Sequence, residues 1–321
     1  MRYLDPRADL TFKRVFGEHP DLVISLINAL LPLDKDHQVK SVEYIPIELV
    51  PDNPLKKNSI VDVRCKDSEG RQFLVEMQMI WSEEFKQRVL FNACKAYVRQ
   101  LDRKEQYELL QPVYSLNLVN DIFQKDSSDY YHHYDVADVD HPDTVIEGLH
   151  LIFIELPKFK PQNYSQKKMQ VLWLRYLTEM GDAQRAPKEL LENPEVSKAI
   201  EILEESSYTE AQLNGYDKFW DIVRTEKTYY NSARQRGIAE GRAEGRAEGR
   251  AEGRAEGRAE GRAEGRAEGR AEGRAEGRAE GRAEGEHQAK ISNAQAMKAD
   301  GMSIESIAKY TGLSVEEIAA L

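Results

Sequence analysis

The chain has 321 residues, of which 40% are hydrophobic and 31% charged, enough for one sizeable folded domain and a small C-terminal element. Its net charge of −11 excludes nucleic-acid binding through overall charge, so any phosphate contact must be local. With no run of about 18 apolar residues, no signal-peptide core and two cysteines without metal-ligand spacing, we expect a soluble, reduced, cytoplasmic protein without membrane contact.

The N-terminal region predicts two helices and a strand. A short helix is expected over 10–16 and a nearly all-round apolar helix over 21–31. Residues 39–49 alternate loosely, as a strand does, and the turn-rich loop that follows carries Lys56 and Lys57. These two lysines are candidates for phosphate contacts, and a solvated loop is the alternative.

The next segment, 60–79, predicts a β-hairpin. Apolar and polar residues alternate on both sides of Asp67-Ser-Glu-Gly70, a sequence that suits a type I turn followed by a left-handed glycine. Such a three-residue loop fixes the register, so that facing residues have numbers that sum to 138. Asp62 is therefore expected opposite Glu76.

Two opposed carboxylates call for a positive charge between them. Residues opposed on one face of an antiparallel pair have Cβ atoms roughly 4.5 to 5.5 Å apart, and like charges there are destabilising. Mg²⁺ binds hard oxygen ligands, commonly one or two carboxylates, and keeps water and phosphate on its other positions. Gln78 points to the same side as Glu76 and could orient a water or a phosphate oxygen. The alternative is a solvated outer face of an amphipathic hairpin.

A further helix is expected over 83–102, capped by Ser82, with its basic residues read as a solvated face. Two strands follow at 112–119 and 149–156, the second as apolar as a central strand. Helical patterns then fill the region from 164 to 230, over 169–180, 187–205 and 210–230.

Histidines between the two strands invite a metal assignment. They are His132 and His133, inside Tyr130-Tyr-His-His-Tyr134, and His141. Adjacent residues of an extended chain point to opposite sides, and no matching ligand set follows in the sequence. No metal site is therefore expected at these histidines.

Taken in order, several stretches resemble the PD-(D/E)XK nucleases, and within them the recombination-promoting nuclease (Rpn) group of transposase-like proteins. The matching stretches are Arg7-Ala-Asp9 with Phe12, Lys13 and Phe16, then Ile60-Val-Asp-Val63, Val75-Glu-Met-Gln78, Arg88 and Phe153-Ile-Glu-Leu-Pro-Lys-Phe159. The resemblance covers about residues 5–230. It implies an α/β fold with a restriction-endonuclease-like αβββαβ core and a helical C-terminal extension.

The resemblance also implies a chemistry: hydrolysis of DNA phosphodiester bonds by a metal-dependent endonuclease, linked to recombination, mobile elements or defence. Asp62 and Glu76 would hold Mg²⁺, or Mn²⁺ in its place. Asp9 matches an early acidic position of the family and is a candidate additional ligand, with a helix N-terminal acid as the alternative.

One position departs from the family pattern. Gln78 stands where the superfamily has a lysine, and glutamine donates only a neutral hydrogen bond to the charge that develops on phosphate. Arg88, or Lys56 and Lys57, are the candidate replacements for the missing cation, and Lys13 is a further candidate for DNA contact.

The C-terminal region begins with eleven consecutive Ala-Glu-Gly-Arg units, from Ala239 to Arg282. A period of four places like charges at i,i+4, and each glycine costs about 0.8 to 1 kcal/mol relative to alanine in a helix. A flexible or marginally helical linker over 238–285 is therefore expected first, and a helical partner-binding rod second. It would follow a nuclease-like domain over 1–237, whose helical subdomain covers about 160–237.

The last segment, 286–321, has the pattern of a helix-turn-helix, with Ser314 and Glu317 as a capping box. Glu316 and Glu317 stand where contacts with bases or phosphates would need donors or positive charge. A packing or self-association element is therefore favoured over a DNA reader, and a homo-oligomer could form through the tail.

A second function remains open from the sequence. The nuclease-like core could be a scaffold with little catalytic activity, in an interaction or regulatory protein that assembles through its C-terminal tail. Gln78, the acidic net charge and the acidic terminal helix favour this alternative.

Overall fold

The computed structural model describes residues 2–48, 60–101, 106–161, 168–181 and 183–321. The chain divides into two compact units, Met1–Ser232 and Ala233–Leu321. Among the described residues, no helix is both long and apolar enough to cross a membrane.

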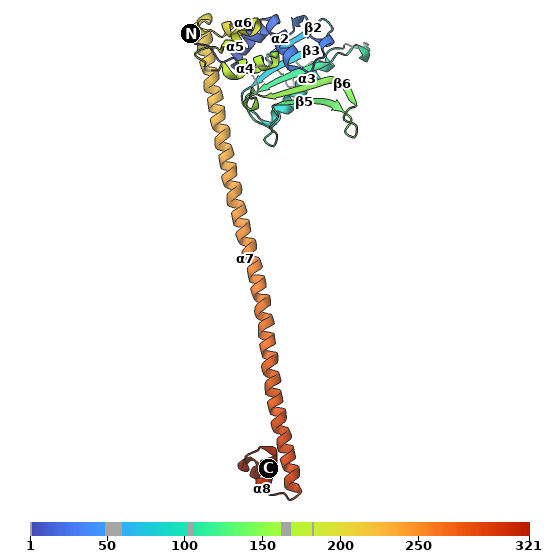
Figure 1. Ribbon diagram of the computed structural model, residues 1–321, viewed down its shortest axis with the longest axis vertical. Helices are drawn as coiled ribbons and strands as arrows, with labels where there is room; N and C mark the ends of the chain where they lie inside the picture. Colours follow the sequence, from blue (N-terminus) through green and yellow to red (C-terminus); the bar gives the residue numbers. More distant parts are fainter. Residues whose placement is uncertain (1, 49–59, 102–105, 162–167, 182) are drawn as a thin grey trace, which may run out of the picture. The chain divides into compact units, whose positions relative to one another are not determined.

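A six-stranded mixed sheet forms the centre of the first unit, with the strand order β1-β2-β3-β4-β6-β5 (Figure 1). The β3–β4 and β4–β6 pairs are parallel, and the other pairs are antiparallel. The strands are β1 (Val42–Tyr44), β2 (Val63–Asp67), β3 (Gln72–Gln78), β4 (Val113–Val119), β5 (Tyr131–Ala137) and β6 (Val145–Glu155).

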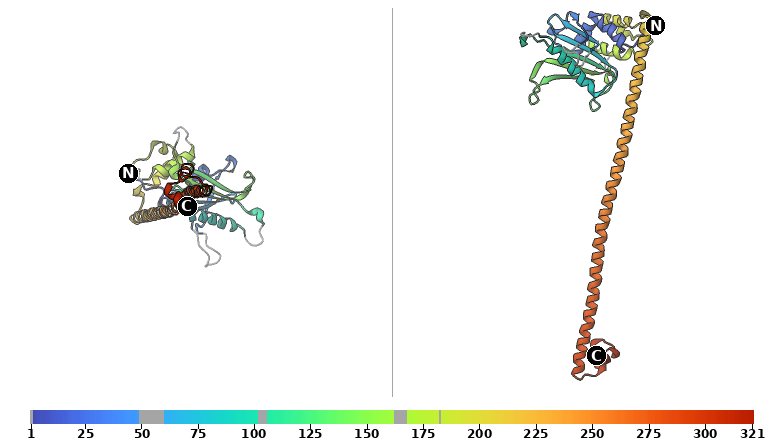
Figure 2. Two further views of the ribbon diagram at one scale, coloured as in Figure 1. Left: turned by 90° about the horizontal axis from the view of Figure 1, so that it is seen from below. Right: turned by 180° about the vertical axis from the view of Figure 1, so that it is seen from behind.

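Helices cover both faces of this sheet (Figure 1, Figure 2). One face packs in the main hydrophobic core against α1 (Asp9–Gly17), α2 (Pro20–Leu30), α4 (Met169–Glu179), α5 (Lys188–Leu191) and α6 (Pro194–Ile202). The other face is covered by α3 (Glu83–Val98), which packs through Ala93 and Ala96 against Leu74 of β3. Short 3-10 helices are η1 (Lys35–His37), η2 (Tyr107–Leu109), η3 (Leu156–Lys158) and η4 (Glu205–Ser207).

The predicted hairpin register is confirmed within the ladder, where Val63 faces Val75 and Cys65 faces Phe73. At the turn, the Gly70 amide donates to the Asp67 carbonyl at 3.2 Å, and Gly70 has a φ of 87°, in the left-handed region. β2 begins at Val63, so the hydrogen-bonded ladder ends one residue before the expected pair of Asp62 and Glu76.

The alternative of a solvated hairpin face is wrong. Leu74, Arg64 and Glu76 all lie on that face, and all three are buried. The reason is α3, which comes after the hairpin and packs back over the sheet, so the polar residues of β3 lie under a helix.

The order α1, β1 to β3, α3 and β4 confirms the expected αβββαβ core, within a mixed sheet of an α/β fold. Several elements differ from expectation. β5 was not predicted, β6 begins at Val145 rather than Leu149, and the helix expected over 187–205 is split into α5 and α6. The split falls where the Asn193 side chain accepts from the Val196 amide and Pro194 opens the new helix.

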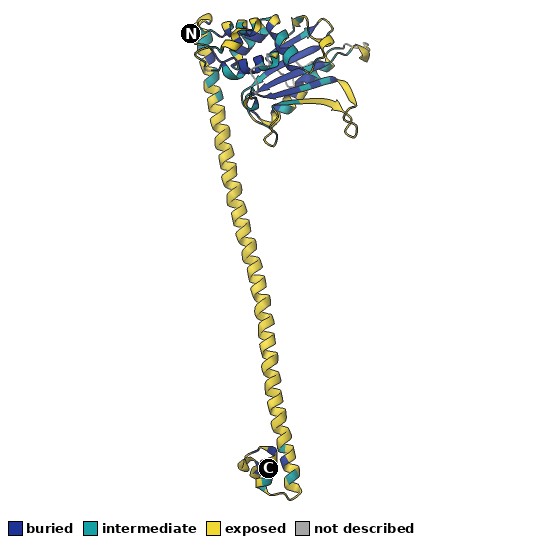
Figure 3. Cartoon of the chain, viewed as in Figure 1, coloured by how far each residue is buried: buried dark blue, intermediate teal, exposed yellow. Residues whose placement is uncertain are grey.

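The repeat is helical throughout: α7 runs from Glu210 to Ala299, and every residue from 224 to 290 is exposed (Figure 3). This differs from the first expectation of a flexible or marginally helical linker. Three of the four residues in each unit are strong helix formers, and a long helix nucleates only once, so cooperativity offsets the glycines.

Two short helices end the second unit, α8 (Ile304–Thr311) and α9 (Val315–Ala320). The expected capping box is present, since the Ser314 hydroxyl accepts from the Glu317 amide and the Glu317 carboxylate accepts from the Ser314 amide. Ile307 and Ile318 pack with Ala294 of α7 in a small apolar cluster. These helices therefore fold back onto the end of α7.

Candidate active site

The carboxylates predicted from the hairpin line one cavity of about 840 Å³ beside α3. Asp62, Glu76, Gln78 and Arg88 all border it, together with Cys94. The three predicted catalytic residues, Asp62, Glu76 and Gln78, therefore meet at one place with Arg88, a predicted phosphate contact. Cys94 is half-buried at this cavity, although its sequence spacing indicated no site.

Asp62 lies just before β2 and is fixed by the neighbouring strand. Its Oδ2 accepts from the backbone amide of Met77 at 2.8 Å, and its side chain is 24% exposed. Burial raises the pKa of Asp62, while the Met77 amide and the more distant Lys13 act to lower it. The carboxylate thus extends the contact between β2 and β3 where the ladder has ended.

Glu76 is on β3 and is only 5% exposed. Its Oε1 accepts from Asn92 Nδ2 of α3 at 3.0 Å, and Arg88 Nη2 lies 3.9 Å from its Oε2. Burial raises the pKa of Glu76 to about 7; the charge of Asp62 acts in the same direction, and the Asn92 hydrogen bond opposes it. The site therefore places a second carboxylate in a poorly solvated position.

Gln78 and Arg88 form a connected pair at the same cavity. Arg88 Nη2 donates to Gln78 Oε1 at 2.7 Å, and Gln78 Nε2 donates to the Ile80 carbonyl at 2.6 Å. The Arg88 side chain is 48% exposed and packs over the Phe85 ring. A guanidinium therefore lies against the amide that replaces the family's lysine.

Asp9 and Lys13 approach the site from α1. Lys13 Nζ lies 2.6 Å from Asp9 Oδ1 and 3.9 Å from Asp62 Oδ1. Lys13 thus links the two acids, although neither Asp9 nor Lys13 borders the cavity. Lys56 and Lys57, the other candidates for phosphate contact, lie outside the described residues.

Asn92 is a site residue that the sequence did not reveal. It is fully buried on α3 and donates to Glu76. The available signal was its position four residues after Arg88, because residues at i and i+4 lie on the same side of a helix. Nothing in the sequence alone indicated that this side of α3 faces Glu76.

The donor set suits a hard divalent cation. Asp62 and Glu76 present carboxylate oxygens to one cavity, and both have raised pKa values because burial disfavours their charge. Within the described ranges, Lys13 and Arg88 come no nearer to them than 3.9 Å. A bound dication would compensate both charges at close range.

The histidines between β4 and β6 require a correction. His132 and His133 do point to opposite sides: His132 Nε2 lies 2.8 Å from Glu155 Oε1, and His133 Nε2 lies 2.9 Å from Asp135 Oδ1. The expectation that no ligand set follows is wrong, because His150 of β6 joins His133 and Asp135 in a group that could hold a metal ion. The partner comes from a neighbouring strand, which sequence spacing does not show.

Comparison with known families agrees with this geometry. The model of the PD-(D/E)XK nuclease family transposases matches residues 6–233, which include the whole sheet and every candidate catalytic residue. The chain therefore belongs to the PD-(D/E)XK nuclease family transposases. Comparisons with curated proteins and with solved structures found no significant match.

Proposed function

We propose that the protein is a Mg²⁺-dependent DNA endonuclease, able to use Mn²⁺, that hydrolyses phosphodiester bonds at the cavity between β3 and α3. The observation that carries this proposal is the pair of carboxylates, the partly buried Asp62 and the buried Glu76, at one cavity in a member of a nuclease family. A cytoplasmic role in recombination, mobile-element movement or defence is part of the same proposal.

In this proposal Asp62 and Glu76 hold the cation, and the strand and helix around them keep the two carboxylates in place. The Met77 amide fixes Asp62, and Asn92 fixes Glu76. Asp9 would act through Lys13, with which it forms an ion pair, rather than as a metal ligand at the cavity. A bound Mg²⁺ supplies positive charge for phosphate oxygens and lowers the pKa of water.

Arg88 would supply the charge that lysine provides elsewhere in the superfamily. Its half-exposed guanidinium borders the cavity and is steadied by Gln78, so its remaining N–H groups can donate to a phosphate oxygen. Gln78 then acts as a positioning residue for Arg88. Lys13 would contact the DNA backbone beside the site.

The experiment is cleavage of supercoiled plasmid, linear duplex and single-stranded DNA side by side, with Mg²⁺ or with EDTA. The chain is expected to nick plasmid only with the metal, and Asp62→Ala and Glu76→Gln are expected to lose nicking with unchanged circular dichroism. Glu43→Gln is the matched control, because Glu43 is an exposed carboxylate of β1 paired with Lys66.

Two results would contradict the proposal. If folded Asp62→Ala cuts as well as the parent chain, the site is misassigned. If the parent chain cuts none of these substrates with Mg²⁺ or Mn²⁺, the alternative of a nuclease-like interaction protein with little activity is favoured. The engagement of both polar atoms of Gln78 is compatible with that alternative.

A further inference from the structure

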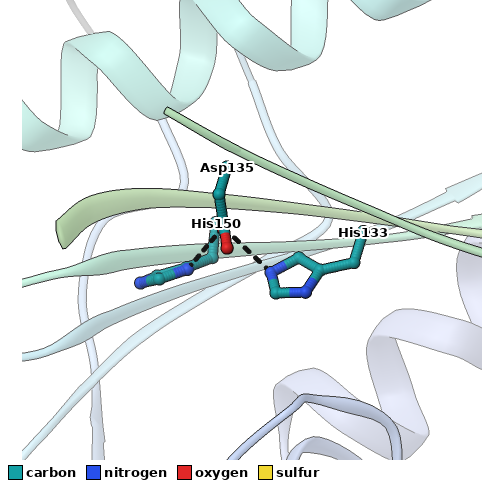
Figure 4. Close-up of side chains that lie close together, drawn as sticks. All are labelled: His133, Asp135 and His150. Atoms are coloured by element: carbon teal, nitrogen blue, oxygen red, sulfur yellow. Dashed lines mark hydrogen bonds and ion pairs between the residues drawn. The ribbon is translucent and has the colours of Figure 1, made fainter. Parts of the chain in front are cut away.

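A second group of donor side chains lies at the β5–β6 pair, away from the candidate active site. His133 and Asp135 come from β5 and His150 from β6 (Figure 4). His150 and Ile152 are two residues apart on β6 and so lie on the same face of the sheet, and Ile152 belongs to the core that packs against α1, α2 and α4. Glu76 and Leu74 are likewise two residues apart on β3 and lie on the face under α3. The two sites are therefore on opposite faces of the sheet.

An irregularity in strand pairing creates this group. Tyr134 pairs with Leu151, but Val136 pairs with Ile146, so the stretch 147–150 of β6 bulges opposite Asp135 alone. Gly148 in the bulge has a φ of 151°, and a Cβ there would lie 3.2 Å from the Tyr97 ring. Bulges redirect side chains, and this one places His150 beside Asp135.

Three donor atoms converge on one point. Asp135 Oδ1 lies 2.7 Å from His150 Nδ1 and 2.9 Å from His133 Nε2. The donor atoms of the three residues all lie within 4.8 Å of one another. Two imidazoles and a carboxylate on one centre are the ligand types of zinc and neighbouring transition metals.

His150 carries an independent sign of a ligand. Its side chain is 8% exposed, and its Nε2 is buried without a hydrogen-bond partner, although Glu147 Oε2 is 3.2 Å away. When Nδ1 of His150 carries the ring proton and donates it to Asp135, Nε2 carries only a lone pair. Nε2 then cannot donate a hydrogen bond to the Glu147 carboxylate. If a cation took Nδ1, the proton would move to Nε2 and could be donated to Glu147, the usual support of a metal-bound histidine.

The His150 ring is held in place before any ligand arrives. It stacks on Tyr114 of β4 at 4.5 Å between ring centroids, and Tyr114 stacks in turn on Phe73 of β3 at 5.5 Å. These stacked rings cross three neighbouring strands. A fixed ring loses little freedom on binding, which favours affinity.

The charge around the group favours a cation. His133, Asp135 and His150 border a cavity of about 550 Å³, whose lining also includes His37 and the acids Asp34, Glu69 and Glu147. Arg71 also lines it, but this guanidinium is bound to Asp67 at 2.7 Å. The cavity leaves room for water as a fourth ligand.

We propose that His133, Asp135 and His150 form a binding site for a late first-row transition-metal dication such as Zn²⁺, which ties β5 to the bulge of β6. In a tetrahedral Zn²⁺ site with bonds of about 2.0 to 2.1 Å, ligand atoms are about 3.3 to 3.4 Å apart. The two Asp135 contacts therefore lengthen by about 0.5 Å on binding. The site at Asp62 and Glu76 offers only oxygen and takes a hard cation instead.

The test is isothermal titration of Zn²⁺ into the full chain, with excess Mg²⁺ present to occupy the carboxylate site. We expect one equivalent of bound Zn²⁺ in the parent chain. His133→Ala and Asp135→Asn are expected to bind it at least about 100-fold more weakly. Two controls are expected to bind as the parent chain does: His141→Ala, an exposed histidine between β5 and β6, and Asp62→Asn.

Thermal unfolding provides the second measurement, with Zn²⁺ raising the Tm of the parent chain but not of His133→Ala. Asp135→Asn, which keeps the side-chain shape, decides the matter if His133→Ala does not fold. The proposal is overturned if the parent chain binds no Zn²⁺, if both cluster variants bind it unchanged, or if Asp62→Asn alone loses it.

Discussion

Glu76 is buried under α3, where it accepts a hydrogen bond from the neutral side chain of Asn92, while Asp62 is held by a backbone amide. Neither contact neutralises a carboxylate. Folding therefore keeps two acids where water solvates them poorly, at a cost in stability that a bound dication would remove.

This burial predicts how stability depends on pH when EDTA removes metal ions. The pKa of Glu76 rises from 4.5 to about 7, so the folded chain binds this proton more tightly than the unfolded chain. The contribution of this proton to the free energy of unfolding is then full below about pH 4.5. It is lost as pH rises toward 7, by on the order of 3 kcal/mol. Burial of Asp62 acts with the same sign.

Urea unfolding between pH 4.5 and 8 measures this dependence. Glu76→Gln, which carries no titrating proton, is expected to flatten the slope, and Glu43→Gln is expected to leave it as in the parent chain. An unchanged slope in Glu76→Gln would mean that this carboxyl titrates normally.

Arg88 gives a prediction for catalysis. Arg88→Ala removes the guanidinium that borders the cavity and is expected to lower the plasmid-nicking rate by about 100-fold, the usual effect of losing one charge-stabilising donor. Arg88→Lys should recover part of the rate, and Lys125→Ala, a change of an exposed lysine, should have no effect. Equal rates for Arg88→Ala and the parent chain would show that another cation serves the phosphate.

At the scale of elements, the hairpin was predictable because its information is local. The turn sequence determined the pairing of β2 with β3, and that pairing placed Asp62 near Glu76. Asn92 and the histidine group were not predictable in this way, since both depend on which elements meet in three dimensions. β5 was missed because it is largely exposed and mostly polar, so it lacks the apolar alternation of a half-buried strand.

The turn itself can be tested through Gly70. Gly70→Ala places a Cβ on a residue with a φ of 87° and is expected to destabilise the first unit by roughly 1 to 2 kcal/mol. Gly215→Ala is the matched control, because Gly215 is helical with nothing within 4 Å of the added Cβ, and it should stabilise by up to about 1 kcal/mol. Denaturant unfolding compares the two, and equal effects would contradict the turn assignment.

At the scale of the whole molecule, the family match ends at residue 233, close to the boundary between the two compact units. The residues after this boundary form an exposed helix, with glycine at every fourth position of the repeat, and a small terminal cluster. The repeat was evident from the sequence, but local propensity underestimated its helicity, because helix formation is cooperative over the full length.

The exposed helix leads us to expect self-association through the tail. Small residues at a spacing of four allow two helices to approach closely. Size-exclusion chromatography with light scattering should give an oligomer for the full chain and a monomer for a chain ending at Gly237. A monomeric full chain would contradict this prediction and leave the nuclease assignment untouched.

The most direct test of the central claim follows metal binding and cleavage in one titration. Bound Mn²⁺ is measured by electron paramagnetic resonance while plasmid nicking is measured at the same Mn²⁺ concentrations. We predict that nicking rises with occupancy of a site that Asp62→Asn removes, so that this variant loses one equivalent of Mn²⁺ together with its activity. Full nicking or undiminished Mn²⁺ binding in folded Asp62→Asn would contradict the assignment of Asp62 and Glu76 as the catalytic metal site.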